Sequence, residues 1–441
     1  MTDESPDTLT FPPGFLWGTA TAAHQVEGDN RNNQWHAWEQ QPGRIYAGHR
    51  SGRACGWWVP GGAEADLDRA AQLGQNAHRL SVEWSRIEPE PGVFDEAALQ
   101  RYRQILLHMR DRGLEPMVTL HHFTDPLWAA RRGGWENPAI IGWFRRYVQR
   151  VVGTLGDLVS YWCTINEPNI YVALGYLRTD FPPGKPDPVR ALRVMNHLLR
   201  GHAAAYRVIH QMDGSAKVGI AHHVAVFDPA RPDSAWDRMA ARLHDWVFNQ
   251  ITLRAPVDGK IRFPAGSGLV YGPLVDSQDF IGLNYYVHYL VEADPTTIEL
   301  ARYRFPAGAP VTDVKANGEP YCALSPEGFY RALRRVGSFG KPVIVTENGI
   351  PDAQDRLRPR MLVTYLEQLH RAIQEGVDVR GYFHWTLVDN FEWAEGWKLR
   401  FGLIEMDPET GQRRPRRSAE LYAEIARSNA LPARLLSSVA E

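Results

Sequence analysis

Two glutamates end apolar, β-branched runs that lie far apart in the chain. Glu167 follows such a run in TINEP, and Glu347 follows one in VTENG. Pro168 cannot extend a strand ladder and Asn348-Gly349 favours a turn, so both acids are expected where a strand passes into a loop. Alone, each would be read as a solvated acid at a strand end. Together they could supply one protonated and one ionised carboxyl, as cleavage of a glycosidic bond requires.

Other polar side chains could share a pocket with these two acids. Gln25 can both donate and accept hydrogen bonds, which suits neighbouring sugar hydroxyls. Glu392 offers an acceptor beside the stacking face of Trp393, although a surface acid next to core tryptophans is the alternative. Arg79 is a guanidinium in an apolar run and needs a buried partner, which an ionised pocket carboxylate would supply. His122 would either donate to a sugar hydroxyl or be a satisfied core histidine.

The sequence predicts no metal site and no cofactor. His121-His122 and His222-His223 are adjacent pairs in strand-like segments, so the two rings of each pair should point to opposite faces. The chain contains no HExxH motif, and no Gly-rich loop of phosphate-binding spacing follows a strand.

The elements that would position these residues alternate between strand and helix. Residues 95–112 have apolar positions at helical spacing, an N-cap at Asp95 and a stop at Gly113, and 188–212 and 361–375 are similar. Such alternation predicts an α/β fold, a (β/α)8 TIM barrel, which gathers the carboxyl ends of its strands around one pocket. The eight strand-like runs are 15–20, 77–82, 115–121, 158–165, 217–224, 279–286, 341–347 and 379–385.

Three long intervals rich in Gly, Pro and polar residues, 21–75, 167–187 and 287–340, are expected to build the walls of that pocket. No repeat, linker or low-complexity tract divides the chain, so residues 1–441 are predicted to form one catalytic domain. The tail QRRPRRSAELYAEIA reads as a basic, solvated turn followed by a helix capped by Ser418.

Composition limits the possible partners. Of 441 residues 44% are apolar and 23% charged, the net charge is −2, and no apolar stretch is long enough to span a bilayer. We therefore expect a small-molecule substrate rather than a nucleic acid or a membrane. The acidic N-terminal segment without an apolar core and three scattered cysteines, read as buried free thiols, favour a cytoplasmic location. No oligomeric state is assigned.

Six motifs in order resemble those of glycoside hydrolase family 1, the β-glucosidase family. They are FPPGFLWGTATAAHQVEG, GQNAHRLSVEWSRIEP, TINEP, IGLNYY, VTENG and DNFEWAEG, and the likeness runs from about Phe11 to Ala426. One such motif would be weak evidence, whereas six in the same order are highly specific.

The resemblance implies a (β/α)8 barrel that hydrolyses β-glycosides with retention of configuration, by way of a covalent glycosyl-enzyme. It makes Glu167 the acid/base and Glu347 the nucleophile. The residues that it implies in substrate binding are Gln25, His122, Asn166, Asn284, Tyr286, Trp385, Glu392, Trp393 and Phe401, with Arg79 in a supporting role beside the nucleophile.

The chain departs from the common family pattern around its third strand, where Phe123 stands at a position that is often Trp, and in its ACGWW and EGWKLRFG segments. These departures concern the outer subsites. A 6-phospho-β-glycosidase is one alternative, but those enzymes lack an acid at the position of Glu392. A non-catalytic glycoside-binding barrel is another, but such a protein would typically have lost one catalytic acid. A transglycosylase stays open, because acceptor choice depends on the outer subsites.

Overall fold

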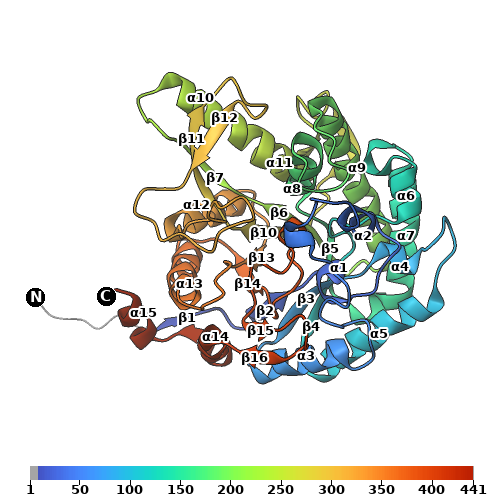
Figure 1. Ribbon diagram of the computed structural model, residues 1–441, viewed down its shortest axis with the longest axis horizontal. Helices are drawn as coiled ribbons and strands as arrows, with labels where there is room; N and C mark the ends of the chain where they lie inside the picture. Colours follow the sequence, from blue (N-terminus) through green and yellow to red (C-terminus); the bar gives the residue numbers. More distant parts are fainter. Residues whose placement is uncertain (1–7, 441) are drawn as a thin grey trace, which may run out of the picture.

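Eight parallel strands close into a barrel (Figure 1). The computed structural model describes residues 8–440. Around the barrel the strands follow the order β10, β13, β14, β2, β3, β4, β5 and β6. Their bounds are Ile281–Tyr285, Val343–Asn348, Val379–Trp385, Leu16–Ala20, Ala77–Ser81, Glu115–Thr119, Tyr161–Asn166 and Lys217–His223, respectively. The predicted TIM barrel is confirmed.

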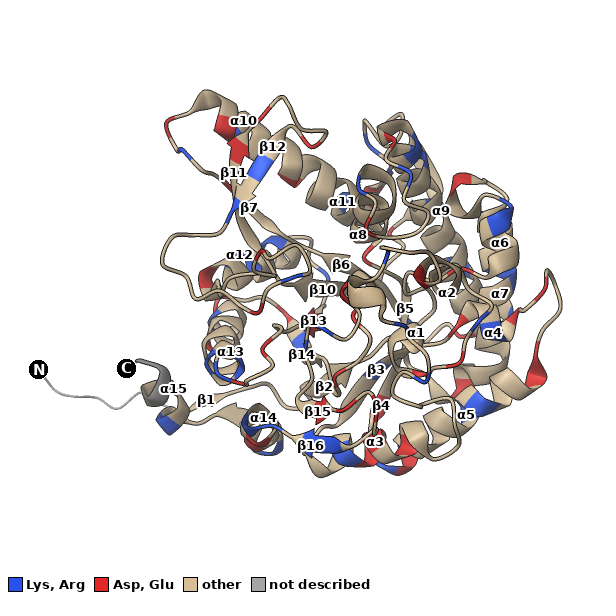
Figure 2. Cartoon of the chain, viewed as in Figure 1, with Lys and Arg blue, Asp and Glu red and all other residues tan. Residues whose placement is uncertain are grey.

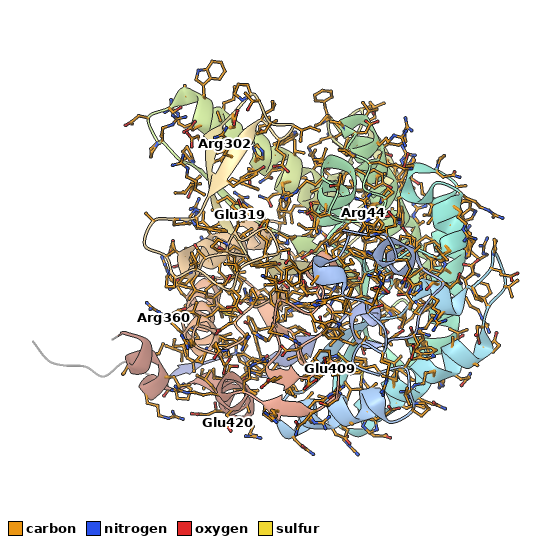
Figure 3. All side chains as sticks on the ribbon, viewed as in Figure 1. Arg44, Arg302, Glu319, Arg360, Glu409 and Glu420 are labelled. Atoms are coloured by element: carbon orange, nitrogen blue, oxygen red, sulfur yellow. The ribbon has the colours of Figure 1, made fainter. Side chains whose placement is uncertain are left out.

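One helix on the outside of the barrel follows each barrel strand. These helices are α3 Gly62–Gln72, α5 Glu96–Asp111, α7 Ile140–Leu155, α9 Pro188–Met212, α11 Ile251–Asp258, α12 Pro326–Gly337, α13 Arg358–Gln374 and α14 Arg417–Ser428. Because the strands are covered by helices on one face and packed into the barrel interior on the other, they are buried almost throughout. Side chains crowd the space between the strands and the surrounding helices (Figure 3). Basic and acidic residues are interspersed along the outer helices in the view of Figure 2.

The predicted element bounds hold to within a few residues. Asp95 caps α5 by accepting from the Ala98 amide, and Gly113 takes a positive φ just beyond its end. The fifth strand begins later than expected, at Tyr161, because 156–158 form a short 3-10 turn. Helix α13 begins at Arg358 rather than at 361, with a proline in its first turn, where a missing N–H costs nothing.

Smaller elements rise from the carboxyl ends of the strands. They are α1 Ala23–Val26, α2 Gln34–Glu39, α4 Trp84–Ile87, α6 Leu127–Arg131, α8 Pro168–Val172 and α10 Ala235–His244. Strands β7 Val226–Pro229, β11 His288–Ala293 and β12 Ala301–Arg304 form a separate three-stranded sheet. Helix α10 packs on this sheet, and together they project from one side of the barrel (Figure 1).

Three two-stranded ladders and a last helix complete the described chain. The ladders pair β1 Leu9–Thr10 with β17 Ala430–Leu431, β8 Gly259–Lys260 with β9 Val270–Val275, and β15 Ile404–Met406 with β16 Arg413–Pro415. Helix α15 is Ala433–Ala440. Among residues 8–440, no helix has both the length and the apolar character needed to cross a membrane.

The reading of the basic tail as solvated was wrong for two of its arginines. Arg413 pairs with Asp66 at 3.0 Å, and buried Arg416 pairs with Asp389 at 2.8 Å. Ser418 does not cap α14, because its hydroxyl donates to Asp355 at 2.6 Å instead.

All three cysteines are free and buried, as predicted. Much of the N-terminal segment on which the location was argued, residues 1–7, lies outside the described residues.

Candidate active site

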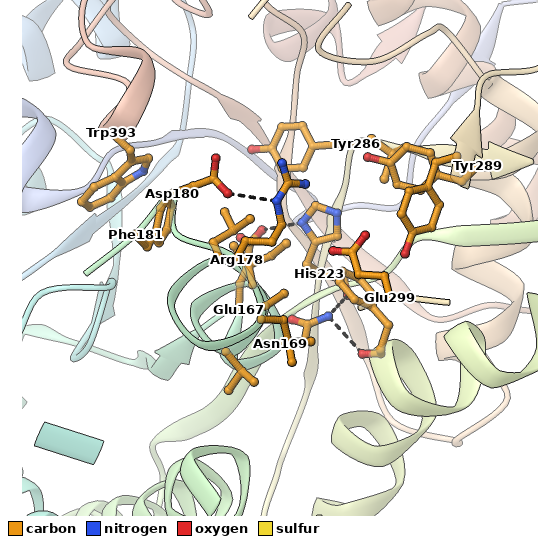
Figure 4. Close-up of a pocket in the computed structure, with 18 of the residues that line it drawn as sticks. Glu167, Asn169, Arg178, Asp180, Phe181, His223, Tyr286, Tyr289, Glu299 and Trp393 are labelled. Carbon is orange, nitrogen blue, oxygen red and sulfur yellow. Dashed lines mark hydrogen bonds and ion pairs between the residues drawn. The ribbon is translucent and has the colours of Figure 1, made fainter. Parts of the chain in front are cut away.

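The two sequence-predicted acids face one cavity of about 470 Å³ at the carboxyl ends of the strands. Glu167 immediately follows β5, and Pro168 then starts α8. The backbone of Glu167 lies in the left-handed region with φ 43°, a strained conformation for a residue with a side chain. Glu347 is the second-last residue of β13. Both side chains are buried and line the cavity, whose wall around Glu167 is drawn in Figure 4.

Glu347 is held by one cation and one hydroxyl. Arg79 Nη1 donates to Oε1 at 2.5 Å, and the Tyr286 hydroxyl donates to Oε2 at 2.8 Å. The other terminal nitrogen of Arg79 donates to Asn166 Oδ1 at 2.7 Å. Burial raises the pKa of Glu347 to about 7, aided by the charge of Glu167 and opposed by Arg79 and Tyr286. The two carboxyls are therefore electrostatically coupled, so ionisation of one opposes ionisation of the other.

Glu167 has different partners. Asn284 Nδ2 donates to its Oε1 at 2.8 Å, and His223 Nδ1 lies 3.1 Å from the same oxygen (Figure 4). No guanidinium or ammonium group is within ion-pair distance of Glu167 among the described residues. One carboxyl thus faces a permanent cation, whereas the other faces an amide and an imidazole. This asymmetry is what two carboxyls with different roles need.

Asn166 is oriented by its surroundings. Its Oδ1 accepts from Arg79 and from Asn284 Nδ2, the latter at 3.1 Å, so the amide nitrogen must point the other way. That nitrogen lies 3.1 Å from His122 Nε2 at the cavity wall. The cavity therefore meets the donor end of Asn166.

A third buried acid lies at the far end of the site. Glu392 Oε2 accepts from Gln25 Nε2 at 3.0 Å, and the same nitrogen also donates to Asn390 Oδ1. Burial raises the pKa of Glu392 to about 8, and the charges of Glu347 and Glu167 act in the same direction. Glu392 therefore carries a proton at neutral pH and can both donate and accept hydrogen bonds.

Aromatic rings close this part of the cavity. The His122 ring stacks at 5.9 Å on Trp385 and at 6.0 Å on Trp393, and all three line the cavity. Phe123 packs edge-on against Trp393 at 5.3 Å. Flat apolar faces beside polar groups suit a pyranose ring, whose C–H bonds and hydroxyls lie on different sides.

The predicted site residues divide into those that reach the cavity and those that support it. Lining the cavity are His122, Asn166, Glu167, Tyr286, Glu347, Trp385, Glu392 and Trp393. Gln25, Arg79 and Asn284 lie behind these residues and hold them by hydrogen bonds. Phe401 does not line the cavity but packs on Tyr321, with ring centroids 5.2 Å apart.

Sequence reasoning missed His223, Tyr321 and a polar cluster at the mouth. His223 was considered only as one of a metal-binding pair, yet it ends β6 and so stands at the same rim as the two acids. That end-of-strand position was the available signal. The paired histidines separate as expected, since His122 and His223 line the cavity and their neighbours do not. Arg178 and Asp180, an ion pair of 2.9 Å at the mouth, had no comparable signal (Figure 4).

Comparison with known proteins gives a consistent result. A family model described as "Glycosyl hydrolase family 1" matches residues 7–431. A β-galactosidase of Pyrococcus woesei is 32% identical over 95% of this chain and 97% of its own length, and β-glucosidase A of Thermotoga maritima is 32% identical over 96% and 98%.

Solved structures agree with these sequence matches. A β-glycosidase from Pyrococcus horikoshii superposes with a TM-score of 0.89 at 38% identity, covering 98% of this chain and 99% of that one. The Thermotoga maritima β-glucosidase in complex with glucoimidazole gives 0.87 at 31% identity, with coverage of 96% and 99%.

Proposed function

Since this chain belongs to glycosyl hydrolase family 1, whose members hydrolyse O-glycosyl bonds, we propose that it is a retaining, exo-acting β-glycosidase. The terminal β-D-glucosyl residue is the substrate that we favour, with β-galactosyl and β-fucosyl residues as further candidates. The observation that carries the proposal is the pair of buried carboxyls, Glu167 and Glu347, which face one cavity with unlike partners. No cofactor takes part in the mechanism proposed here.

In the first step Glu347 attacks the anomeric carbon and Glu167 protonates the departing oxygen. Arg79 and Tyr286 favour the ionised form of Glu347 and keep both its oxygens oriented. Retaining enzymes separate their two carboxyls by about 5–5.5 Å, which leaves no room for a water in place of the nucleophile.

In the second step water attacks the glycosyl-enzyme. Once Glu347 is an ester its negative charge is gone from the site, and Glu167 takes the proton from the incoming water. His223 and Asn284 hold the Glu167 carboxyl in place through both steps. Displacement occurs twice at the same carbon, so the configuration is retained.

The sugar would lie between the aromatic faces and the polar groups. The amide nitrogen of Asn166 is directed to donate to the 2-hydroxyl, a contact that strengthens in the transition state. Glu392 and Gln25, already joined by a hydrogen bond, would bind the hydroxyls furthest from the bond that breaks, over the face of Trp385. His122 and Trp393 complete this end.

The alternatives have less support. A phosphorylated sugar would place its charge near Glu392, which is buried beside the neutral amide of Gln25 and has no cation within ion-pair distance among residues 8–440. A merely binding barrel would not need two buried carboxyls with unlike partners, because burying them costs stability. Both β-galactosidases and β-glucosidases occur among the similar proteins, so these relatives support galactosyl and glucosyl residues alike as the sugar that is released. The cytoplasmic location stays a prediction.

The test is a rate survey over nitrophenyl β-D-glucoside, galactoside, fucoside and 6-phosphoglucoside, followed by cellobiose. We expect the glucoside to be among the best substrates, with the β-anomer of the sugar as the first product seen by NMR. An α-anomer as the first product would contradict the retaining mechanism. Turnover of the phosphorylated substrate alone would reassign the enzyme.

A further inference from the structure

The loop that brings Glu392 and Trp393 to the cavity follows β14. Between Trp385 and Ile404 its only regular element is the 3-10 turn Trp393–Glu395. A barrel strand is held in register by its neighbours, whereas a loop has no such ladder and is fixed mainly by side-chain contacts. The position of Glu392 therefore depends on the contacts that this loop makes with other parts of the chain.

Asp389 anchors this loop to Arg416, the residue that joins β16 to α14. The Asp389 carboxylate is fully buried, and its Oδ1 and Oδ2 accept from Arg416 Nη1 and Nη2 at 3.0 and 2.8 Å. Oδ1 also accepts from the Gly402 amide at 2.8 Å, and Arg416 Nη1 donates to the Gly402 carbonyl at 2.7 Å. A two-point pair of this kind fixes the direction of the carboxylate as well as its distance. Asp389 therefore cannot rotate without breaking both bonds to Arg416.

Hydrogen bonds lead from the residue after Asp389 to the cavity. This residue, Asn390, is buried, and its Oδ1 accepts from Gln25 Nε2 at 3.0 Å. The same nitrogen donates to Glu392 Oε2 at 3.0 Å, so the Gln25 amide lies between Asn390 and Glu392. Glu392 lines the cavity, whereas Arg416 does not. Arg416 is therefore linked to a group that faces the substrate without reaching the substrate itself.

Stability alone does not account for the pair of Arg416 and Asp389. Removing both charges from water costs free energy that two apolar side chains would not lose, so a buried ion pair adds little net stability. A second buried cation lies nearby, because burial lowers the pKa of Arg358 and the charge of Arg416 acts in the same direction. The two guanidinium groups therefore repel each other, which opposes folding. What the pair does supply is a fixed direction for the loop at Asp389.

We propose that Arg416 is a positioning residue for sugar recognition. It fixes the direction of the loop at Asp389 and so the place of the Asn390 side chain. That side chain orients the Gln25 amide, which in turn orients the Glu392 carboxyl. This inference rests on the proposed function, in which Gln25 and Glu392 bind the hydroxyls furthest from the bond that breaks. The two catalytic acids are held by other residues, so the effect should be confined to recognition of those hydroxyls.

The first test uses the hydroxyl groups of the substrate as the readout. For each variant, kcat/KM is measured for nitrophenyl β-D-glucoside and for its 4-deoxy and 6-deoxy analogues, and the glucoside-to-deoxy ratio is compared with the wild-type ratio. Loss of folded protein would lower all three values equally and leave the ratio unchanged. Loss of a positioned partner lowers the ratio, because the deoxy analogues lack the hydroxyl that uses this partner.

Arg416→Met should lower this ratio about tenfold, and Arg416→Lys about threefold. Methionine removes the charge and both bonds to Asp389, whereas lysine keeps the charge but cannot bind both carboxylate oxygens in the same geometry. Because the lysine variant keeps the charge of Asp389 compensated, it gives an answer even if the methionine variant does not fold. A wild-type ratio in the folded Arg416 variants would overturn the inference.

Arg331→Met is the matched control. It removes another two-point pair, in which Arg331 on α12 donates to both oxygens of Asp228 at 2.6 and 2.8 Å. Neither of these residues lines the cavity. We expect the wild-type ratio in this variant, and a loss equal to that of Arg416→Met would overturn the inference.

A double-variant cycle tests the route through Glu392. In the Glu392→Ala background the main group that Arg416 positions is gone, so Arg416→Met should lower kcat/KM for the glucoside about twofold, against about tenfold in the wild-type background. Full additivity of the two losses would show that Arg416 acts on the site by another route and would overturn the assignment.

Calorimetry separates this inference from the proposed function. Methyl 1-thio-β-D-glucoside, whose sulfur link resists hydrolysis, should bind about tenfold more weakly to Arg416→Met than to the wild type, and as tightly to Arg331→Met as to the wild type. Equal affinities for all three proteins would overturn the positioning role even if glycosides are hydrolysed. A wild type that binds the thioglucoside but hydrolyses no β-glycoside would reject the proposed function, whereas a loss of affinity in Arg416→Met would still support the positioning role.

Discussion

Arg79 and Glu347 form a buried ion pair across the barrel, with Nη1 2.5 Å from Oε1. Strands β14 and β2 separate the two strands that carry them. Removing one partner of such a pair leaves an uncompensated buried charge, at a cost of about 3–5 kcal/mol. The position of the proposed nucleophile is therefore fixed by barrel register rather than by a loop.

Glu347→Gly should abolish hydrolysis, with kcat reduced about 10⁴-fold or more, because no covalent intermediate can form. Azide should restore turnover of an activated aryl glucoside by occupying the vacated space. The product should be the α-glycosyl azide, identified by NMR. Failure of azide to rescue, or a product of retained configuration, would count against Glu347 as the nucleophile.

Glu167→Ala should discriminate between leaving groups. Substrates with poor leaving groups, such as cellobiose, should lose about 10²–10⁴-fold in kcat/KM, since they need the proton. A dinitrophenyl glucoside needs no proton and should lose far less in this parameter. Equal losses on both substrates would remove the acid assignment.

Tyr286→Phe should move the acidic limb of kcat/KM to higher pH. The Tyr286 hydroxyl donates to Glu347 and lowers its pKa, which burial has raised to about 7. Without this donor the pKa rises further, so at a given pH below neutrality less Glu347 is ionised. We expect a displacement of about 0.5–1 pH unit. A pH–rate profile with an unmoved acidic limb would contradict this role.

Glu392→Gln should be much milder than Glu392→Ala. Burial raises the pKa of Glu392 to about 8, so at pH 6–7 the group is neutral and glutamine preserves its shape and hydrogen bonding. We expect a loss in kcat/KM within about tenfold for Gln and about 100-fold for Ala. The ratio of Gln variant to wild type should rise from pH 7 to 9, as only the wild type ionises there. Equal losses for Gln and Ala would show that the site needs the carboxylate.

Glu83→Gln should change the pH dependence of stability. Glu83 accepts from the hydroxyls of Ser85 and Thr124, both at 2.9 Å, and burial raises its pKa from 4.5 to about 7. A carboxyl whose folded-state pKa is raised favours folding at low pH, and this contribution is lost as pH rises through 7. In urea unfolding, this group should make the free energy of unfolding of the wild type about 2 kcal/mol lower at pH 8 than at pH 5. The variant should lack this pH-dependent difference.

The control for that measurement is Glu405→Gln, a substitution of an exposed glutamate. It should follow the wild type at both pH values. A Glu83→Gln profile that also followed the wild type would show that Glu83 does not ionise in the folded state within this range.

Much of the fold could be predicted because its signals are local. Parallel strands covered on both faces contain continuous apolar runs, such as the Val-Ile-Val that opens β13, and Pro168 and Gly349 mark where the chain leaves the barrel. Both acids end apolar runs, so the barrel geometry alone predicted that they lie at the same rim of the barrel.

What could not be predicted depends on long-range contacts. The sequence around Arg413 and Arg416 does not distinguish exposed arginines from paired ones, because their partners Asp66 and Asp389 lie elsewhere in the chain. One part of the cavity wall, with Leu243, Ile298 and Leu300, is formed by two insertions that meet there, and neither insertion shows a motif of its own. Phe401, which was assigned by motif, packs on Tyr321 and is not among the residues that line the cavity, and its part in substrate binding stays a prediction.

The outer sheet continues the barrel without a hinge. Only two residues separate β6 from β7, and only two separate β10 from β11. The three-stranded sheet is therefore held as rigidly as the barrel beneath it, although its strands are not part of the closed barrel. Exchanging this sheet between related barrels should therefore change the preference for the leaving group and leave the cleavage step itself unchanged.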